Sequence, residues 1–454
     1  MEAVARYFKF AERGTNIVTE ARAGLTTFMV MAYIIFLNGE IIAKPLGLDL
    51  AAVAAGTCLC AGVLTIAMGL VSNYPFALAA GLGINAVVAY HLAAPKADGG
   101  LGLSAAGAMG VIVIEGVVIT ILVVLGLREA IMRAVPLALK RSIGVGIGLF
   151  ILFIGLANGG LIAGSNSTYG SVPPVAIRPI TEISQWVFLV GLALTFGLYA
   201  LRIKAALIIS IVATSVIAFI TGVSKAPDQW TATPKFDGLF YSLPHISDTF
   251  TGIALITAIL TIFAIMLSDF FDTMGTVTGI AAEAGLADED GNVPGIGRVL
   301  LVDSIAAAVG GFVGVSSNTT YIESAAGVGE GGRTGFTAVV TGVLFLLAIF
   351  LSPLANFIPG VATAPALVLV GYLMFVIVKD INVAEIEDGL PALLTMIVMP
   401  LTYSITDGIG AGFIAWALLK IVHRKWSEIH PLMAIVTLAF VLYFAQDWIL
   451  QVWH

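Results

Sequence analysis

Charged residues are scarce in this sequence. Lys, Arg, Asp and Glu make up only 11% of the 454 residues, whereas a soluble domain carries roughly 25%. Apolar stretches recur from Gly24 to Ile449, and no gap between them is as large as a soluble domain. This composition excludes an ordinary soluble enzyme, and we expect no separate catalytic or regulatory domain.

Cysteine and basic clusters are also rare. The two cysteines, Cys58 and Cys60, sit in an apolar run, where thiols are usually small buried hydrophobes rather than metal ligands. We therefore expect no cofactor and no metal site. The net charge is −7 and no basic stripe is present, so nucleic acid is not an expected partner. Residues 1–20 are charged and interrupted, which argues against a cleavable signal peptide.

Hydrophobic residues, by contrast, make up 59% of the chain. A helix needs about 20 mostly apolar residues to cross a bilayer, so we predict an all-α polytopic membrane protein with about fourteen transmembrane segments. The first half contains roughly 24–44, 51–71, 73–94, 105–126, 137–157, 186–201 and 203–222. The second half contains roughly 251–273, 296–313, 314–328, 334–352, 363–378, 389–404 and 407–423. A last apolar stretch, 431–449, is either an extra span or an interfacial helix.

The basic residues are distributed unevenly between the loops. One side of the predicted membrane protein receives Arg6, Lys9, Arg13, Arg22, Arg128, Arg133, Lys140, Arg141, Arg202, Lys204, Arg298, Arg333, Lys420, Arg424 and Lys425. The long loops 158–185 and 223–249 on the other side contain only three basic residues: Arg178, Lys225 and Lys235. The positive-inside rule then predicts a cytoplasmic amino terminus in a plasma (inner) membrane.

Two of the segments are interrupted by small residues and glycines. Segment three reads YPFALAAGLGINAVVAY from Tyr74, and segment ten reads GFVGVSSNTTYIESAAGV from Gly311. Each is expected to be a short extended stretch followed by a short helix, with residues 316–319 offering N-cap side chains in segment ten. Irregular backbone at membrane depth persists only beside protein or a water-filled cavity.

Each interrupted segment is third in its half of the chain. This placement predicts two inverted repeats of about seven segments each, 1–240 and 241–454, with a binding site between them. Two glycine kinks that serve only helix packing are the alternative interpretation.

Acidic residues inside spans are costly and therefore functional candidates. Asp269, Asp272, Thr273 and Thr276 are spaced i, i+3, i+4 and i+7, so they share one helix face that must point to the protein interior. Three other acids, Glu40, Glu115 and Asp303, are interpreted as helix–helix bonds or members of a polar network.

Glu323 and Asn85 occupy the matching short helices of segments ten and three. A carboxylate is stabilised near a helix N-terminus, and an amide offers both donors and an acceptor. A cavity with these groups and Asp272 suits a neutral, planar, donor-rich ligand, because two carboxylates would repel a bare anion.

Several long motifs carry a family resemblance. FDTMGT, TTYIESAAGVGEGGRTG, GFTAVVTGVLFLLAIFLSP, MPLTYSITDGIGAGF, GLTTFMVMAYIIFLN and GLGINAVVAY resemble the AzgA-like hypoxanthine/guanine/adenine permeases of the nucleobase–ascorbate transporter family. The resemblance implies a core domain of spans one to four and eight to eleven. The remaining spans form a gate domain, which often mediates a homodimer.

By motif match, the resemblance implies that Asp272, Glu323 and Asn85 bind the purine. Thr273, Thr276 and Thr320 complete the expected substrate-binding set, and Asp269, Asp272 and Glu323 are the expected proton-coupling residues. Pyrimidine and xanthine relatives often place a glutamate where Asp272 stands, so the shorter side chain favours the purine branch. Val87 stands where the branch usually has an aromatic residue, a departure that concerns fine substrate preference.

The expected function is therefore import of purine nucleobases by proton symport. Two other functions remain open at this stage. An anion transporter of the same fold would face its substrate with helix N-termini and would not need two carboxylates beside it. An intramembrane aspartyl protease needs two carboxylates that share a proton, but its Gly-x-Gly-Asp signature is missing.

Overall fold

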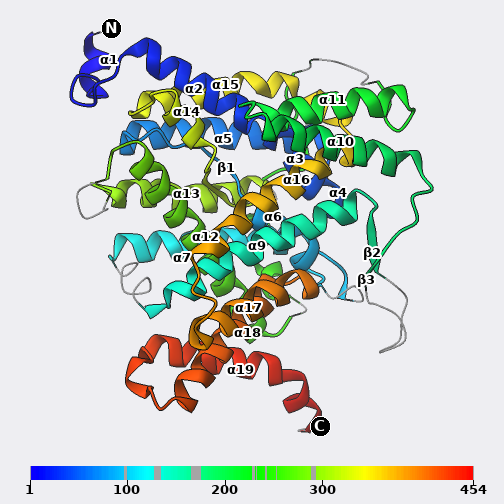
Figure 1. The fold of residues 1–454 in the computed structure, drawn as a ribbon, viewed down its shortest axis with the longest axis vertical. Coiled ribbons are helices and arrows are strands. Elements are labelled where there is room, and N and C mark those ends of the chain that lie inside the picture. The colour runs from blue at the N-terminus through cyan, green and yellow to red at the C-terminus, as the bar shows by residue number, and fades with distance from the viewer. Residues whose placement is uncertain are drawn as a thin grey trace.

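The computed structural model describes residues 2–96, 100–126, 134–164, 175–226, 231, 233–240, 243–251, 253–287 and 293–452, and it is almost entirely helical (Figure 1). Arg128 and Arg133, which belong to the predicted basic side, lie outside the described residues. The amino-terminal helix α1 (Glu2–Tyr7) precedes the first long apolar segment.

Within the first half, three of the long helices begin at side-chain caps. Asn16 accepts from two backbone amides of α2, Asp49 caps α5 and Ser104 caps α7. The helices are α2 (Ile17–Met31), α3 (Ile34–Asn38), η1 (Gly39–Ala43), α4 (Lys44–Leu46), α5 (Leu50–Ser72), α7 (Ala105–Val124), α9 (Leu137–Asn158), α10 (Ile183–Ala200) and α11 (Ala206–Ile220). Helices α2 to α4 run on as a single apolar segment of 30 residues.

The second half begins with η4 (Leu243–Phe250) and is again mostly helical. Its helices are α12 (Leu255–Glu283), α13 (Ile296–Val313), α15 (Gly335–Ala348), η5 (Ile349–Asn356), α16 (Gly360–Phe375), η6 (Val376–Asp380), α17 (Ile386–Thr402), α18 (Ile405–Val422), η7 (Trp426–Glu428) and α19 (Pro431–Val452). The predicted end of span eight at residue 273 is wrong, because α12 continues for ten further residues. The glycines of the segment that follows Asp272 do not stop this helix.

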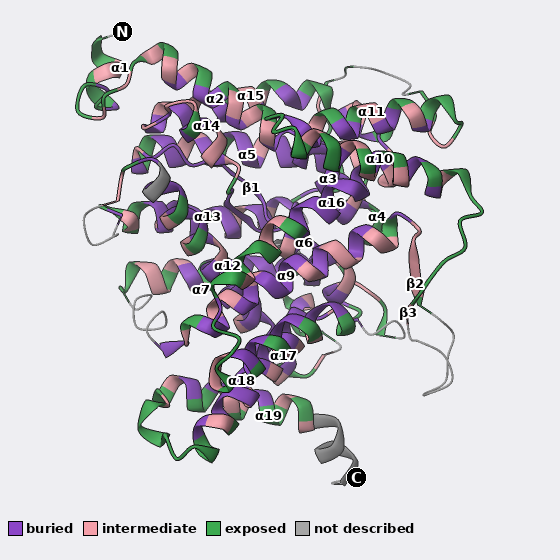
Figure 2. Ribbon diagram, viewed as in Figure 1, coloured by how far each residue is buried: buried purple, intermediate pink, exposed green. Residues whose placement is uncertain are grey.

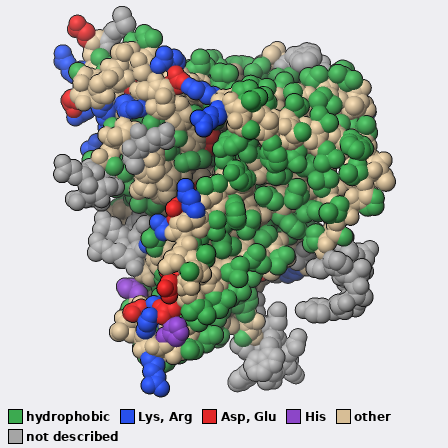
Figure 3. Space-filling view, in the orientation of Figure 1, with side chains coloured by type: hydrophobic (Ala, Val, Ile, Leu, Met, Phe, Trp, Pro, Cys, Tyr) green, Lys and Arg blue, Asp and Glu red, His purple; other side chains and the backbone are tan. Residues whose placement is uncertain are grey.

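Ten helices of the described residues are long and apolar enough to cross a membrane, and three shorter ones, Leu82–Leu92, Ala206–Ile220 and Pro431–Ala445, are apolar too. In the space-filling view, hydrophobic side chains cover the centre and right of the visible face, whereas most charged side chains gather along its left edge (Figure 3). These features confirm a polytopic all-α membrane protein. The predicted number of segments and the inverted repeats remain predictions.

The two interrupted segments meet in the middle of the molecule. Segment three consists of β1 (Leu78–Ala80), α6 (Leu82–Val87) and η2 (Val88–Leu92), and segment ten consists of β4 (Asn318–Thr320) and α14 (Ser324–Gly329). Strands β1 and β4 pair antiparallel, with Ala79 opposite Thr319. The two extended stretches thus satisfy each other's backbone groups, as membrane depth requires. A second small ribbon, β2 (Ile162–Gly164) with β3 (Val175–Ile177), lies at the periphery.

The predicted N-cap function of residues 316–319 is wrong. Asn318 and Thr319 belong to strand β4, and Glu323 itself occupies the cap position of α14 without a side-chain capping bond. Ser316 has a φ of 75°, in the left-handed region, where the chain turns from α13 into the strand. The strand displaces the helix start because its backbone pairs with β1.

Buried residues run through the interior of the helix bundle (Figures 1 and 2). By their mutual contacts, the helices form two groups. The first group contains α2, α5, α7, α12, α13, α14 and α15, and the second contains α9, α10, α11, α16, α17 and α18. Within the first group, α5 and α15 approach so closely that a Cβ on Gly335 would lie 1.9 Å from the Gly69 carbonyl oxygen. Small residues give the same close packing between α9 and α16, where Gly148 faces Gly371.

Candidate functional site

A cleft of about 520 Å³ separates the two helix groups. The first group contributes Val30, Ile322, Glu323, Ala325 and Ala326, and the second contributes Tyr199, Ala200, Arg202, Ile203, Lys204, Ala206, Leu207, Leu369 and Leu373. Most of the lining side chains are apolar. The charged ones are the carboxylate of Glu323 and the basic side chains of Arg202 and Lys204. A concave apolar site with a few polar groups is the usual form of a small-molecule site.

Glu323 reaches this cleft from the residue that precedes α14. Its Oε1 accepts a 2.6 Å hydrogen bond from the hydroxyl of Tyr33, which is fully buried between α2 and α3. This length is within the range of a hydroxyl that donates to a carboxylate. Tyr33 therefore fixes the position of the Glu323 carboxylate. We did not predict this contact from the sequence, although Tyr33 belongs to the motif GLTTFMVMAYIIFLN.

Asp272 lies on α12 and is only partly buried, unlike Asp269, Thr273 and Thr276 on the same side of the helix, which are all buried. Its carboxylate is close enough to Glu323 for the two charges to repel each other. The ion pairs of the described residues include neither carboxylate. This pair of uncompensated acceptors would repel an anion and would favour a ligand that donates hydrogen bonds.

Asn85 is fully buried in α6 and does not line the cleft. Its Nδ2 donates to Oδ1 of Asn38 at 2.7 Å, and Asn38 in turn donates to Thr57 and to the Val315 carbonyl. The Oδ1 of Asn85 has no hydrogen-bond partner within the described structure. A buried amide oxygen without a donor is costly, so Oδ1 of Asn85 is an unsatisfied acceptor inside the protein.

Asp303 of α13 organises the strand of segment ten. One of its oxygens accepts from both the amide and the hydroxyl of Thr320 at 2.8 Å, and the other accepts from Thr273 at 2.7 Å. Thr273 also shares a 2.8 Å bond with Thr319. The hydroxyls of Thr273 and Thr320, predicted to bind substrate, are thus directed to Asp303. The network function predicted for Asp303 matches these contacts.

Asp269 lies one turn before Asp272 on α12. Its Oδ2 accepts from the Ser317 hydroxyl at 3.1 Å, in the turn that leads into β4. Thr276 is buried further along the same side of the helix. The structure therefore brings Asp269, Asp272 and Glu323 to the neighbourhood of β4.

An ion cluster bridges the two helix groups beside the cleft. Glu330, at the end of α14, pairs with Arg22 of α2 at 3.1 Å and with Lys204 from the turn between α10 and α11. Lys204 also lines the cleft. The contact thus holds the two walls together at the side of the molecule where the basic residues gather.

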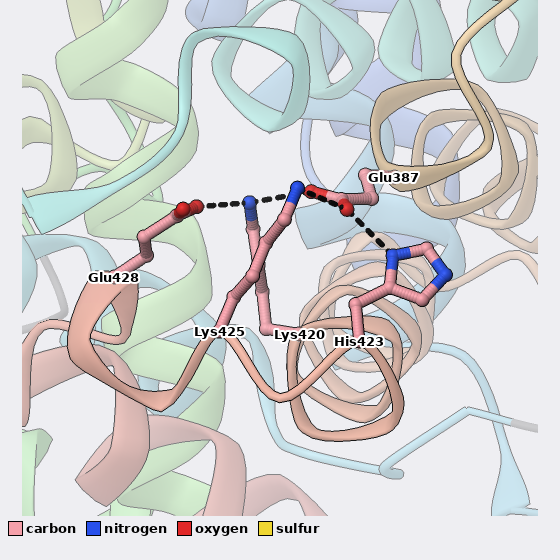
Figure 4. A network of polar contacts seen from close by, with 5 residues as sticks. All are labelled: Glu387, Lys420, His423, Lys425 and Glu428. Carbon is pink, nitrogen blue, oxygen red and sulfur yellow. Dashed lines mark hydrogen bonds and ion pairs between the residues drawn. The ribbon is translucent and has the colours of Figure 1, made fainter.

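A second polar cluster lies within the other helix group (Figure 4). Glu387, at the start of α17, accepts hydrogen bonds of 2.6 Å from both Lys420 and Lys425, and its Oε1 lies 2.6 Å from Nδ1 of His423. Lys420 also contacts Glu428 at 2.5 Å. The bonds from Lys420, Lys425 and His423 lower the pKa of Glu387 to about 2. This cluster ties α17 to α18 and does not line the cleft.

Comparison with known proteins places this geometry in context. The Xan_ur_permease model of the Permease family matches residues 19–411. The chain is 38% identical over 445 residues to the adenine permease AdeP of Escherichia coli K12, covering 96% of this chain and 95% of that protein. It is 37% identical over 451 residues to the guanine/hypoxanthine permease PbuG of Bacillus subtilis 168, covering 96% and 98%.

Solved structures of the same fold also exist. The transmembrane domain of the cyanobacterial bicarbonate transporter BicA superposes with a TM-score of 0.62 at 14% identity, over 87% of this chain and 97% of that domain. At this level of identity the likeness concerns the fold alone. The family points to a transporter rather than to an enzyme.

Proposed function

The chain belongs to the Permease family, and we propose that it imports purine nucleobases (hypoxanthine, guanine or adenine) by proton symport. The observation that carries this proposal is the apolar cleft between the helix groups, which Glu323 lines. Asp272 does not line the cleft but is close enough to Glu323 to interact with it electrostatically. A purine is planar, fits between apolar walls, and presents several N–H donors along its edges. The names of the relatives AdeP and PbuG support the same class of substrate.

In the proposed binding mode, Asp272 and Glu323 accept hydrogen bonds from ring and exocyclic N–H groups of the base. The unpartnered amide oxygen of Asn85 accepts another donor once the base or a bridging water reaches it. Thr276 lines the same side of α12 as Asp272. Thr273 and Thr320 act through Asp303, which holds the strand beside the base.

Transport then follows from relative movement of the two helix groups. The first group corresponds to the core domain and the second to the gate domain, through which we expect a homodimer to form. We propose that the amino terminus is cytoplasmic in a plasma (inner) membrane. The cleft is then open to the cytoplasm, because Arg202 and Lys204 line it.

Proton coupling is proposed for Asp272, Glu323 and Asp269, which are acidic groups in or beside the cavity. A carboxylate at membrane depth without a basic partner holds a proton in part of the cycle, because its charge is costly there. Binding of a base that donates to Asp272 and Glu323 favours one protonation state of the pair. A proton that moves with the base would couple uptake to the proton gradient.

The test is uptake of labelled hypoxanthine into proteoliposomes with an imposed pH gradient and no sodium. We expect accumulation above the outside concentration, collapse by a protonophore, and competition by adenine and guanine but not by sulfate. The variants Asp272→Asn and Glu323→Gln should both lose uptake, since each leaves ligand donors unpaired at a cost of about 1–3 kcal/mol. Saturable sulfate uptake without hypoxanthine uptake would overturn the proposal in favour of anion transport.

A further inference from the structure

Three carboxyl groups meet behind the candidate site, where α7, α12 and α13 pack together. Glu115 of α7 is fully buried, and Asp269 and Asp303 are almost fully buried. The carboxyl group of Glu115 is within hydrogen-bonding reach of Asp269, and both Asp269 and Asp303 act on it electrostatically. Among the described residues, no group of His, Cys, Asp and Glu side chains is arranged to hold a metal ion.

The three carboxyl groups differ in the hydrogen-bond donors that reach them. Asp303 accepts from Thr273 and twice from Thr320, so both of its oxygens are satisfied as an ionised carboxylate. Asp269 accepts from Ser317 through Oδ2, while its Oδ1 lacks a donor. Neither oxygen of Glu115 receives a hydrogen bond from any protein donor described. Two ionised carboxylates cannot bond to each other, whereas a carboxylic acid can donate to a carboxylate.

The described surroundings provide no other compensation for a charge on Glu115. Helices α7 and α13 touch directly beside it, because a Cβ on Gly116 would lie 2.3 Å from the backbone nitrogen of Ala308. Water therefore has no room on that side. An unpaired ionised carboxylate buried in this way would cost several kcal/mol.

Other charged or titratable groups on elements that pack against α7 are directed elsewhere than toward Glu115. Asp248 of η4 lies at the beginning of α7, where it accepts from Ser104 at 3.3 Å. His91 of η2 is directed to Ser404, with 3.5 Å between Nε2 and the hydroxyl. Arg298 of α13 is exposed to solvent.

We propose that Glu115 and Asp269 share one proton, as an acid–carboxylate pair, and that this is the proton carried with the substrate. The inference rests on the proposed transport function and deepens it by adding Glu115, a residue outside the cleft. The proton binds when the core domain faces outward and leaves when it faces the cytoplasm. No other atom is transferred, and Glu115 returns to its ionised form only transiently.

The position of Asp269 explains how such a pair senses the substrate. Asp269 and Asp272 lie one turn apart on α12, and the Asp272 charge acts on Asp269. A base bound at Asp272 changes the charge felt by the pair. Ser317, which donates to Asp269, also leads into β4, so movement of the strand alters the same carboxylate. Substrate binding and proton binding are therefore linked through one helix turn.

The decisive variant is Glu115→Gln, because glutamine keeps a neutral donor toward Asp269 and so imitates the permanently protonated state. We expect the variant to retain hypoxanthine binding and counterflow exchange but to lose accumulation driven by a pH gradient. A pH-sensitive dye inside the proteoliposomes should also report loss of substrate-dependent proton entry. The matched control is Glu40→Gln, which removes another intramembrane-segment carboxylate that pairs with the exposed Lys44 and should keep full coupling.

A second measurement does not depend on transport activity. Infrared spectra of the purified wild-type protein at neutral pH should contain a carboxylic acid C=O band that shifts in D₂O. The band should lose intensity in Glu115→Gln and keep its intensity in Glu40→Gln. An unchanged band in Glu115→Gln would overturn the assignment of the proton to this pair.

The outcomes separate this inference from the proposed function. Absence of hypoxanthine uptake in the wild type would defeat the transport proposal itself. Wild-type uptake that ignores the pH gradient would defeat proton symport and this inference together. Suppose instead that uptake by the wild type is coupled to the pH gradient. An accumulation ratio that is unchanged in Glu115→Gln would then overturn only the present inference, because the proton on the pair would be structural.

Discussion

The hydroxyl of Tyr33 donates a 2.6 Å hydrogen bond to Oε1 of Glu323, although the two residues are 290 positions apart in the chain. Tyr33 comes from the first helix segment and Glu323 from the second interrupted segment. The bond therefore joins the two parts of the first helix group at the wall of the cleft. It also occupies one oxygen of Glu323, so that the other is the oxygen a ligand can use.

The first prediction concerns this bond. Tyr33→Phe should raise KM for hypoxanthine by about 10- to 100-fold while changing kcat little, because a hydrogen bond to a charged group contributes about 1.5–3 kcal/mol. Initial-rate kinetics in proteoliposomes measure both constants. The matched control is Tyr74→Phe, which removes a 2.8 Å bond to the Pro294 carbonyl away from the cleft and should leave KM unchanged. Equal KM values for wild type and Tyr33→Phe would contradict the positioning function.

Asp303 gives a second prediction about the strand of segment ten. Asp303→Asn replaces an acceptor oxygen by an amide that faces the Thr273 or Thr320 donors, which leaves a buried donor unpaired at about 1–3 kcal/mol. We expect a lower melting temperature and a loss of uptake. Thr320→Val removes one hydroxyl but keeps the backbone bond to Asp303, so its effect on both should be smaller. The opposite ranking in thermal unfolding and uptake assays would argue against Asp303 as the organising residue.

The third prediction concerns the ion pair between Lys204 and Glu330, which joins the two helix groups. Lys204→Gln or Glu330→Gln should favour the conformation in which the groups separate at this side. The side chain of Lys204 is 62% exposed, so the pair contributes about 0–1 kcal/mol and the shift should be no more than about fivefold. Lys204→Arg, which keeps the positive charge facing Glu330, should retain the wild-type balance.

Labelling of Ala326→Cys by an impermeant maleimide measures this balance, because Ala326 lines the cleft. The native Cys58 and Cys60 are buried and contribute little background. Labelling rates that are identical in wild type and both single variants would show that the ion pair does not hold the cleft in this state.

The sequence predicted the helical segments well, because apolar length is a strong local signal. It also located both interrupted segments, since glycine and β-branched runs at membrane depth are unusual. The pairing of β1 with β4 could not be read in this way, and without it residues 316–319 resembled a helix cap. The predicted end of α12 was too early, because the glycine-containing stretch past Asp272 stays helical in the folded protein.

The sequence singled out the acidic residues of the candidate site but not the side chains that contact them, and the binding roles remain predictions. Asp272 and Glu323 stand out because an acid in an apolar run is costly. Tyr33 carries no such signal, since a tyrosine in a span is ordinary. The pairing of Glu115 with Asp269 depends on how α7 meets α12, a long-range contact that spacing within a single helix cannot reveal.

The last prediction uses the polar cluster at the start of α17, where bonds from Lys420, Lys425 and His423 hold the pKa of Glu387 at about 2. An unfolded glutamate has a pKa of about 4.3, so the folded value is depressed and the carboxylate stabilises the fold only while it is ionised. Its contribution is complete above about pH 4.3 and is lost as the pH falls toward 2. Glu387→Gln should therefore lower the melting temperature of the detergent-purified protein at pH 7, and the difference from wild type should shrink as the pH falls from 5 to about 2. Glu385→Gln is the matched control, because Glu385 is exposed and makes no side-chain capping bond, and it should show no such trend. A difference between wild type and Glu387→Gln that stays constant over this range would mean that the carboxylate acts through its shape rather than its charge.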